Sequence, residues 1–490
     1  MAASINTMPY LSTIVFLPLA AAVAIVLAPR GWSRWIAGAV SLTVMGLSLL
    51  LFAHFDRSAA GLQFVEKATW IPQYGVSYFL AVDGLSLPMV VLTGLLTFVA
   101  VLASWRLDLR PREYFALVMV LETAMMGVFV SLDLLLFFLF WELELAPMYL
   151  LIGVWGGPRR EYAAMKFILY TIAGSVFMLV GILALYFASG QSSFDMTVLG
   201  AQQYGVAFQV AAFVLLYLGF AVKIPVFPFH TWLPDAHVEA PTPISVLLAG
   251  VLLKMGGYGL LRIPIGLLPD AAREAAPWLV ALAVINVLYG AAVSMVQDDL
   301  KKLIAYSSVS HMGYVLLGAA ALTGVGMQGA VLQMFTHGTI TGLLFLMVGL
   351  VYDRTHTRVI ADLGGLGARM PLIAVVFVVA GLASLGLPGM SGFVAEFLVF
   401  IGSFPVWQLA TLLAAFGIVV TAGYLLWMLQ RVFMGPLPEK WAGLGDASRL
   451  EVFTVGLMVA VIVGVGVYPS ILTDVIRVGV VPIVQRIAVL

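Results

Sequence analysis

Eight ionisable side chains stand near the middle of long apolar segments of this sequence. Charged groups are costly at membrane depth, so a group kept there is read by default as functional. Carboxylates, amines and imidazoles are also the groups that accept and release protons in proteins. The set indicates proton transfer inside a membrane, and it consists of Glu122, Glu142, Glu144, Lys223, Lys254, His311, His337 and Glu396.

Glu142 and Lys223 are the two residues that we predict to form an ion pair. A buried carboxylate and a buried amine hold each other charged, and their separation lets either exchange a proton. A static structural salt bridge is the alternative, although it does not explain why Lys223 stands at a helix break. Glu144 lies about 200° around the same helix from Glu142, so both cannot face one partner. We expect Glu144 to face a neighbouring subunit or a second half-channel.

Lys254 and His337 are the next candidates. No acidic residue stands near Lys254 on its own segment, and Gly256 and Gly257 leave room beside it for water. The alternative is a lysine whose amine extends to the membrane interface. His337 lies among Thr and Gly residues, a lining suited to water, and histidine titrates near physiological pH. A hydrogen-bonded core histidine is the alternative there.

The remaining groups have weaker assignments. Glu396 follows a second helix break and is placed to receive or release protons near the outer half of the membrane. His311 is equally well explained as a core histidine, and Glu122 has no evident partner. Asp133 precedes a long apolar run, and we expect it to cap that helix rather than to carry protons.

The composition requires a membrane protein. The chain has 490 residues, of which 62% are hydrophobic and 10% charged, and its mean hydropathy is +1.08. Soluble domains carry about 25% charged residues. A net charge of zero argues against a nucleic-acid partner, and the absence of Cys excludes Cys-ligated iron–sulfur clusters and disulfides. The six histidines are scattered, and no metal, nucleotide or nucleophile motif is found.

The apolar segments predict an all-α, polytopic fold. A membrane-spanning helix needs about 20 mostly apolar residues, and continuous apolar runs of that length favour helices over barrel strands. Fourteen segments qualify: 10–28, 35–54, 85–104, 113–131, 134–154, 165–187, 208–228, 243–263, 277–297, 302–322, 328–350, 371–400, 408–434 and 451–473.

The basic residues predict the orientation of these spans. Cytoplasmic loops carry an excess of Lys and Arg. The odd-numbered loops, counted from the one after the first span, hold sixteen of the 24 Lys and Arg residues. We therefore place both termini outside, on the periplasmic side, and interpret the first span as a retained helix rather than a cleaved signal. The sixteen are Arg30, Arg34, Arg106, Arg110, Arg112, Arg159, Arg160, Lys166, Lys301, Lys302, Arg354, Arg358, Arg369, Arg431, Lys440 and Arg449.

Two spans are interrupted, the seventh at VKIPVFP and the twelfth at LGLPGMSG. The breaks fall at Pro225 and Pro228 and at Pro388, where proline removes a backbone donor. Freed backbone groups at membrane depth survive only inside protein or beside water, and matched broken helices are typical of inverted repeats that translocate ions. We predict N-terminal spans 1–3 (1–112), an inverted pair of five-helix repeats (113–263, spans 4–8, and 277–434, spans 9–13), and span 14 with a tail (435–490).

Polar residues follow the first break where the chain approaches the cytoplasmic side. We interpret them as candidate lining of a proton path, and capping of the turn between spans seven and eight is the alternative. They are His230, Asp235, His237 and Glu239.

Four stretches resemble the antiporter-like subunits of respiratory complex I. They are FFLFWELELAPMYLLIGVWG (137–156), HTWLPDAHVEAPTPISVLLAGVLLKMGGYGL (230–260), VQDDLKKLIAYSSVSHMGY (296–314) and LPGMSGFVAEFL (387–398). The family also contains subunits of Mrp-type cation/proton antiporters and of membrane-bound hydrogenases. Glutamate at position 396, where lysine is usual, resembles the M-type subunits, and so does the expected lack of a long lateral helix after the last span.

The resemblance implies roles for individual residues. Glu142 and Lys223 match the family's paired residues on helices 5 and 7, Lys254 the helix-8 lysine, His337 the helix-11 histidine and Glu396 the terminal residue on helix 12. Two acids depart from the family pattern, and either would be a lineage-specific proton path or partner contact: Glu122 and Glu144.

The resemblance also implies an activity. The chain would be a proton-translocating subunit of an NADH:quinone oxidoreductase in a bacterial inner membrane, coupled to electron transfer in other subunits. It would hold no cofactor itself, with FMN and iron–sulfur clusters in partner subunits, and its neighbours would be L-type and N-type antiporter-like subunits and membrane lipids. An Na⁺/H⁺ antiporter subunit, a membrane-bound hydrogenase subunit and a passive scaffold of the membrane arm are the alternatives.

Overall fold

The computed structural model describes residues 9–190 and 192–489, so the expectation that segment 1–8 holds no cleavage signal lies outside the described residues. In the described part, helices coincide with each of the fourteen predicted spans, and twelve are long and apolar enough to cross a membrane. These are α2 (Tyr10–Leu27), α3 (Ser33–His54), α5 (Pro111–Val130), α6 with α7 (Leu134–Leu143, Leu145–Trp155), α8 (Arg160–Ser189), α10 (Val206–Lys223), the composite span Thr242–Ile265, α14 (Pro269–Met295), α15 (Leu300–Ala320), α16 (Gly324–Thr355), α19 (Gln408–Phe433) and α20 (Arg449–Val467).

The remaining elements are shorter or lie at the ends. Three apolar helices complete the spans, α4 (Leu87–Ala103), α17 (Pro371–Ser384) and α18 (Ser391–Ser403). Two short helices follow spans six and seven, α9 (Met196–Gly200) and α11 (Trp232–Glu239). The sequence did not predict an antiparallel hairpin of β1 (Gln63–Ile71) and β2 (Val76–Val82), or the helix α21 (Ser470–Val489) where a tail was expected.

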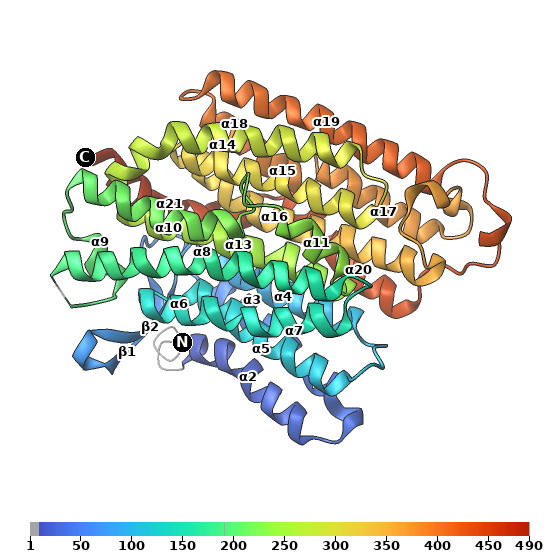
Figure 1. The fold of residues 1–490 in the computed structure, drawn as a ribbon, viewed down its shortest axis with the longest axis horizontal. Helices are drawn as coiled ribbons and strands as arrows, with labels where there is room; N and C mark the ends of the chain where they lie inside the picture. The colour runs from blue at the N-terminus through green and yellow to red at the C-terminus, as the bar shows by residue number, and fades with distance from the viewer. Residues whose placement is uncertain (1–8, 191, 490) are drawn as a thin grey trace.

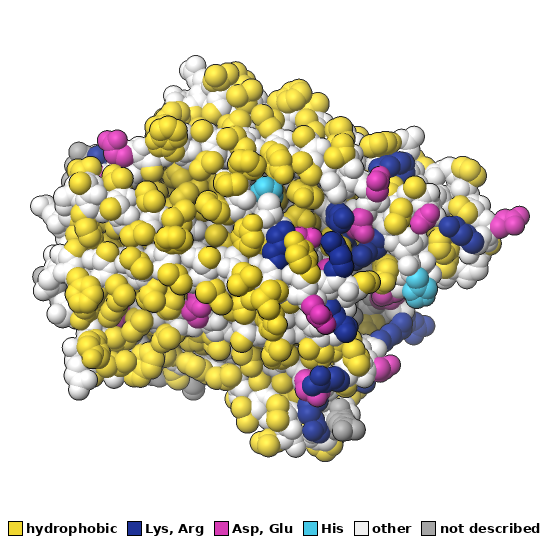
Figure 2. All heavy atoms as spheres, in the orientation of Figure 1, with side chains coloured by type: hydrophobic (Ala, Val, Ile, Leu, Met, Phe, Trp, Pro, Cys, Tyr) yellow, Lys and Arg dark blue, Asp and Glu magenta, His cyan; other side chains and the backbone are white. Residues whose placement is uncertain are grey.

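The long helices run along the longest axis of the molecule (Figure 1). An 18-residue stretch of α16 and one of the composite span are entirely buried within the bundle, and the same holds for nearly all of such a stretch in α15. In α3, α19 and α20, most residues of the corresponding stretch are at least partly exposed. Figure 2 shows that Lys and Arg gather at one end of this axis on the face drawn, while apolar side chains cover most of the rest. The bundle thus has a charged end and an apolar belt suited to lipid.

The fifth span is also broken, at Glu144, and the sequence analysis did not predict this break. Helix α6 ends at Leu143, α7 begins at Leu145, and Glu144 stands between them. Pro147 has no N–H to donate to the carbonyl of Leu143, so the hydrogen-bond ladder is interrupted one turn before it. Asp133 caps α6 as predicted, since its carboxylate accepts from the N–H groups of Leu135 and Leu136.

The two predicted helix breaks are confirmed. Helix α10 ends at Lys223 and α11 begins at Trp232, while α17 ends at Ser384 and α18 begins at Ser391. In the second break Gly386 (φ +79°) and Gly389 (φ +91°) adopt a backbone conformation that favours glycine.

Protein groups satisfy the backbone of the first break. Asn286 of α14 accepts from the N–H of Phe227 at 2.7 Å and donates to the carbonyl of Pro225 at 3.1 Å. The indole of Trp232 donates to the carbonyl of Val222 at 2.9 Å. The break is therefore stabilised by side chains, as a polar backbone at membrane depth requires.

The composite eighth span contains two π-helical segments that the sequence did not predict. It comprises α12 (Thr242–Leu247), η3 (Leu248–Leu252), α13 (Leu253–Leu260) and η4 (Leu261–Ile265). A π-helical turn displaces carbonyls from their usual N–H partners, and such turns frequently mark functional sites. Lys254 is the second residue after the first of them.

Candidate functional site

Lys223 forms an ion pair with Glu144, not with Glu142 as predicted. The amine contacts the Glu144 carboxylate, and the two side chains are 1% and 0% exposed. Lys223 ends α10 at the first helix break, and Glu144 lies at the break between α6 and α7. The amine also lies 5.4 Å from the ring centroids of Trp141 and Phe167, so aromatic faces complete its surroundings.

Glu142 lies on the other side of the fifth span. Its side chain is partly exposed, and its Oε1 atom has no hydrogen-bond partner in the described part of the chain. The two acids face different surroundings, as predicted, but the assignment of faces was reversed. Glu144 faces the buried lysine, and the partly exposed acid is Glu142.

Lys254 and His337 contact each other. The amine lies 2.7 Å from His337 Nδ1, and it also donates to the carbonyl of Ala249, which the π-helical turn leaves available. Lys254 is completely buried, so its amine does not reach the membrane interface. The histidine Nε2 has no partner among the described residues, which leaves it free to exchange a proton with a water or another side chain.

His311 and Glu396 form the next contact of the same cluster. His311 Nδ1 lies 3.2 Å from Glu396 Oε1, and its Nε2 lies 3.2 Å from the hydroxyl of Ser384. The rings of His311 and His337 are 5.6 Å apart. A small cavity between them, lined also by Gln333, Thr336 and Glu396, has about 10 Å³, close to the space that a single water needs.

These contacts define a continuous series of titratable groups that we call the central cluster: Lys254, His337, His311 and Glu396. They come from α13, α16, α15 and α18 and are all buried. Because each neighbour lies within direct or one-water range of the next, the cluster can pass a proton from an amine to a carboxylate.

The polar residues after the first break are two acids with charged or backbone partners and two histidines. Asp235 is paired with Lys166 at 2.7 Å, and Glu239 accepts from the backbone N–H of Arg159 at 3.0 Å, so these two acids attach α11 to the start of α8. His230 lies 3.3 Å from the hydroxyl of Tyr289. His237 is fully buried with neither ring nitrogen bonded in the described residues.

Three residues of the site were missed or misplaced by sequence reasoning. Lys301 was counted with the loops, but it lies in the first turn of α15 and is 4% exposed. The cap Asp299 two residues earlier was the available signal. Asn286 and Ser384 carry no sequence signal, because their partners are far away in the chain.

Glu122 belongs neither to the Glu144–Lys223 ion pair nor to the central cluster. It is fully buried in α5, and neither carboxylate oxygen has a hydrogen-bond partner in the described part of the chain. Among residues 9–190 and 192–489, no group of three His, Asp or Glu side chains is arranged to hold a metal ion.

Comparisons with known proteins place this arrangement in a family. Residues 131–421 match the family described as NADH:quinone oxidoreductase/Mrp antiporter, TM. The chain is 48% identical over 480 residues to NAD(P)H-quinone oxidoreductase chain 4 1 of Synechococcus sp. (strain JA-3-3Ab), covering 95% of this chain and 91% of that relative. It is 46% identical over 480 residues to chain 4 of Gloeobacter violaceus, covering 96% and 91%.

Solved structures share the fold. A chain in respiratory complex I from Thermus thermophilus with bound NADH superposes with a TM-score of 0.90 at 30% identity, covering 98% of this chain and 99% of that one. A chain of the Mrp complex from Dietzia sp. superposes at 0.86 with 20% identity, covering 98% and 100%, which shows the fold alone. The chain therefore belongs to the antiporter-like membrane subunits of the NADH:quinone oxidoreductase family, and it is nearly half identical to their chain 4 members.

Proposed function

We propose that this chain moves protons across the membrane as a subunit of an NAD(P)H-quinone oxidoreductase, coupled to electron transfer in other subunits. The observation that carries the proposal is the central cluster, in which an amine is linked to a carboxylate through two histidines. Buried titratable groups are expensive at membrane depth. A passive scaffold has no use for four of them in one connected series.

The Glu144–Lys223 pair would control this cluster. The backbone of α13 lies against Lys223, since a Cβ atom added at Gly256 would be 3.0 Å from the Cβ of Lys223. While Glu144 holds Lys223, the carboxylate compensates the positive charge of the amine. When the pair opens, Lys223 presents this charge to the helix that carries Lys254. Changes in neighbouring subunits that open the ion pair would thereby drive proton movement through the cluster and out near Glu396.

The proposal also covers the orientation of the chain in the membrane and its neighbours in the complex. The basic end would face the cytoplasm of a bacterial cell, with both termini on the periplasmic side of the inner membrane. L-type and N-type antiporter-like subunits and lipids would cover the apolar belt. FMN and iron–sulfur clusters would lie in other subunits of the complex.

We also propose that residues 113–263 and 277–434 are inverted repeats. Two supporting features occur at equivalent places: Asp133 caps α6 and Asp299 caps α15, each accepting from the N–H groups two and three residues ahead. The next residue then pairs with a strand-like segment after the following span, through Leu134 to Phe194 and Leu300 to Arg358. The fifth and tenth spans thus begin alike.

The function is tested with the purified complex in proteoliposomes. Lys254→Met should abolish proton pumping and quinone reduction coupled to it, while NADH oxidation by an artificial electron acceptor continues at its normal rate. Unchanged pumping in Lys254→Met would refute the proposal. Impaired assembly with normal pumping per assembled complex would favour the scaffold, and Na⁺ uptake in place of H⁺ would favour the antiporter.

A further inference from the structure

A cavity of about 880 Å³ lies at the basic end of the molecule. It is lined by the ends of α4, α7, α12, α15, α16 and α20, and it reaches the surface at the exposed residues Arg106 and Tyr352. Four basic and four acidic side chains line it, so its charges balance. A neutral polar cavity of this size suits water better than a bound anion, and it can hold on the order of tens of water molecules.

Lys301 occupies the inner wall of this cavity. Its amine donates to the carbonyl of Ala240 at 2.7 Å and to the hydroxyl of Ser245 at 3.2 Å. In the described part of the chain no carboxylate oxygen lies within 4.0 Å of it, because Asp299 is paired with Arg358 at 3.4 Å. A buried ammonium with only neutral acceptors has an electrostatic reason to give up a proton.

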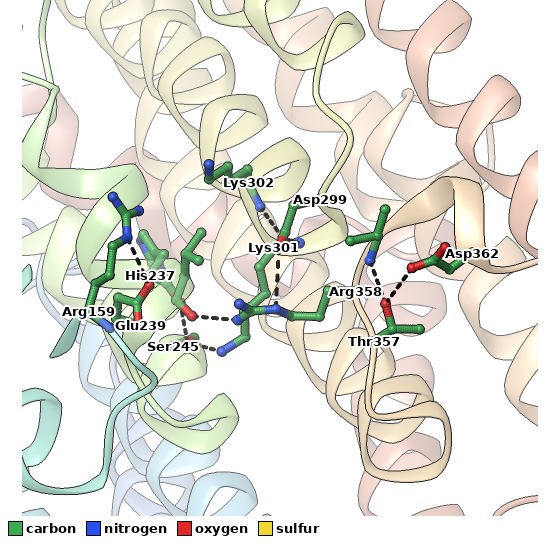
Figure 3. Close-up of polar contacts among 12 residues, drawn as sticks. Arg159, His237, Glu239, Ser245, Asp299, Lys301, Lys302, Thr357, Arg358 and Asp362 are labelled. Carbon is green, nitrogen blue, oxygen red and sulfur yellow. Dashed lines mark hydrogen bonds and ion pairs between the residues drawn. The ribbon is translucent and has the colours of Figure 1, made fainter.

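Ser245 connects this amine to the backbone of His237. The Ser245 hydroxyl donates to the backbone carbonyl of His237 at 2.9 Å and accepts from Lys301, and Figure 3 shows the three residues, which come from α12, α11 and α15. The His237 ring stacks on Phe345 with centroids 5.0 Å apart, and both of its nitrogens lack partners among the described residues. The positive charges of Lys301 and Lys254 both act on the His237 imidazole.

We propose that Lys301 is the residue that loads protons into the central cluster from the water-filled cavity. The proposal rests on the proposed function and adds its cytoplasmic access point. The route leads from the cavity to Lys301, then to His237, and on to Lys254 and His337. It reaches the cluster without passing through the Glu144–Lys223 pair, which is left to control the process.

The proton balance of the step is simple. A proton leaves the Lys301 ammonium and reaches a free ring nitrogen of His237 by way of water, which leaves a neutral amine and an imidazolium. The imidazolium then passes a proton to the Lys254–His337 contact and becomes neutral. Lys301 regains its proton from water in the cavity, and the cytoplasm supplies that proton.

Substitutions at position 301 test the role in the intact complex. Lys301→Met removes the amine, whereas Lys301→Arg keeps a positive charge and the hydrogen-bond donors but cannot release a proton. The next residue, Lys302, lies in the same turn but is partly exposed, so Lys302→Met is the matched control. Proton uptake and quinone reduction are measured in proteoliposomes, together with the amount of assembled complex.

We expect Lys301→Met and Lys301→Arg each to lower proton uptake per assembled complex by about a hundredfold or more, the lower limit of the usual loss of a proton-transfer group. Lys302→Met should stay within about twofold of the parent. Rescue by arginine would overturn the proposal, because it would show that only charge and packing matter. Failure of both variants to assemble would overturn it as well.

The Lys254→Met variant separates this inference from the proposed function. If the chain carries protons but Lys301 does not load them, Lys254→Met abolishes pumping and Lys301→Arg leaves it intact. If neither variant changes pumping, the proposed function itself is wrong.

Discussion

Replacement of Glu144 should impair proton pumping far more than replacement of Glu142. Glu144 and Lys223 are 0% and 1% exposed, and removing one partner of a buried ion pair costs about 3–5 kcal/mol. In Glu144→Gln the amide oxygen still accepts from the amine and recovers about 1–2 kcal/mol of this. The net cost of keeping Lys223 charged is then about 2–3 kcal/mol, which corresponds to a factor of about 30–150 in a rate that depends on it.

A double-mutant cycle measures this interaction directly. The rate of proton uptake by proteoliposomes is compared for the parent complex, Glu144→Gln, Lys223→Met and the double variant. The structure predicts a coupling energy of about 2–3 kcal/mol, because the double variant removes both charges and leaves none unpaired. The same cycle with Glu142→Gln should give a coupling energy below about 0.5 kcal/mol.

The single variants also provide a qualitative check. Glu142→Gln should stay within about threefold of the parent rate, since Glu142 is partly exposed and forms no ion pair in the described residues. A larger loss in Glu142→Gln than in Glu144→Gln, with the coupling energy found at position 142, would refute the assignment of the lysine's partner.

Three further substitutions test how the site is held in place, each by the thermal unfolding midpoint of the purified complex. Asn286→Leu should lower it clearly, because two buried backbone groups at the first helix break lose their partner at about 1–3 kcal/mol each. Asp133→Ala should cost about 1 kcal/mol for the lost helix cap and about 1 kcal/mol more for the lost hydrogen bond from the N–H of Ser77, Asp133→Ser should restore the cap alone, and protons pumped per electron pair should not change. Gly127→Ala should destabilise by about 1–3 kcal/mol because its new methyl group would lie 2.2 Å from Phe140, whereas Gly46→Ala meets nothing within 4 Å and serves as the control.

The spans and their breaks could be predicted from the sequence because both depend on local chemistry. Apolar runs of about 20 residues require helices in lipid, and prolines end them wherever they stand. The positions of Lys223 and Glu396 beside the two breaks followed from the same reasoning. The hairpin β1–β2 was missed because the argument against strands applies only to the lipid-facing segments.

The partner of Lys223 could not be predicted in the same way. Periodicity fixes the angle between Glu142 and Glu144, but which of the two faces the bundle depends on how the fifth span packs against its neighbours. Pro147 held a usable signal, since it interrupts the helix at Glu144 and so sets that residue apart. Lys301 shows the same limit, because its burial depends on α11 and on the loop before α12, some 60 residues away.

The order of groups in the central cluster suggests why proton transfer through it is inexpensive. When Lys254 and Glu396 are both charged, moving one proton from the amine to the carboxylate through His337 and His311 neutralises both ends at once. The transfer therefore removes two buried charges, which a low-dielectric interior favours, rather than creating them.

After the transfer, Lys254 must be protonated again. In the proposed mechanism the Glu144–Lys223 ion pair controls this step. Two like charges about 8 Å apart repel by about 2 kcal/mol at an effective dielectric constant of about 20. While Glu144 compensates Lys223, this repulsion would be small, and in the proposed mechanism Lys254 would be loaded again from the cavity at the basic end. Once the pair opens, the released lysine would disfavour a charged Lys254 and drive its proton toward Glu396. The close approach of α13 to Lys223 at Gly256 places the two helices where this repulsion can act between them.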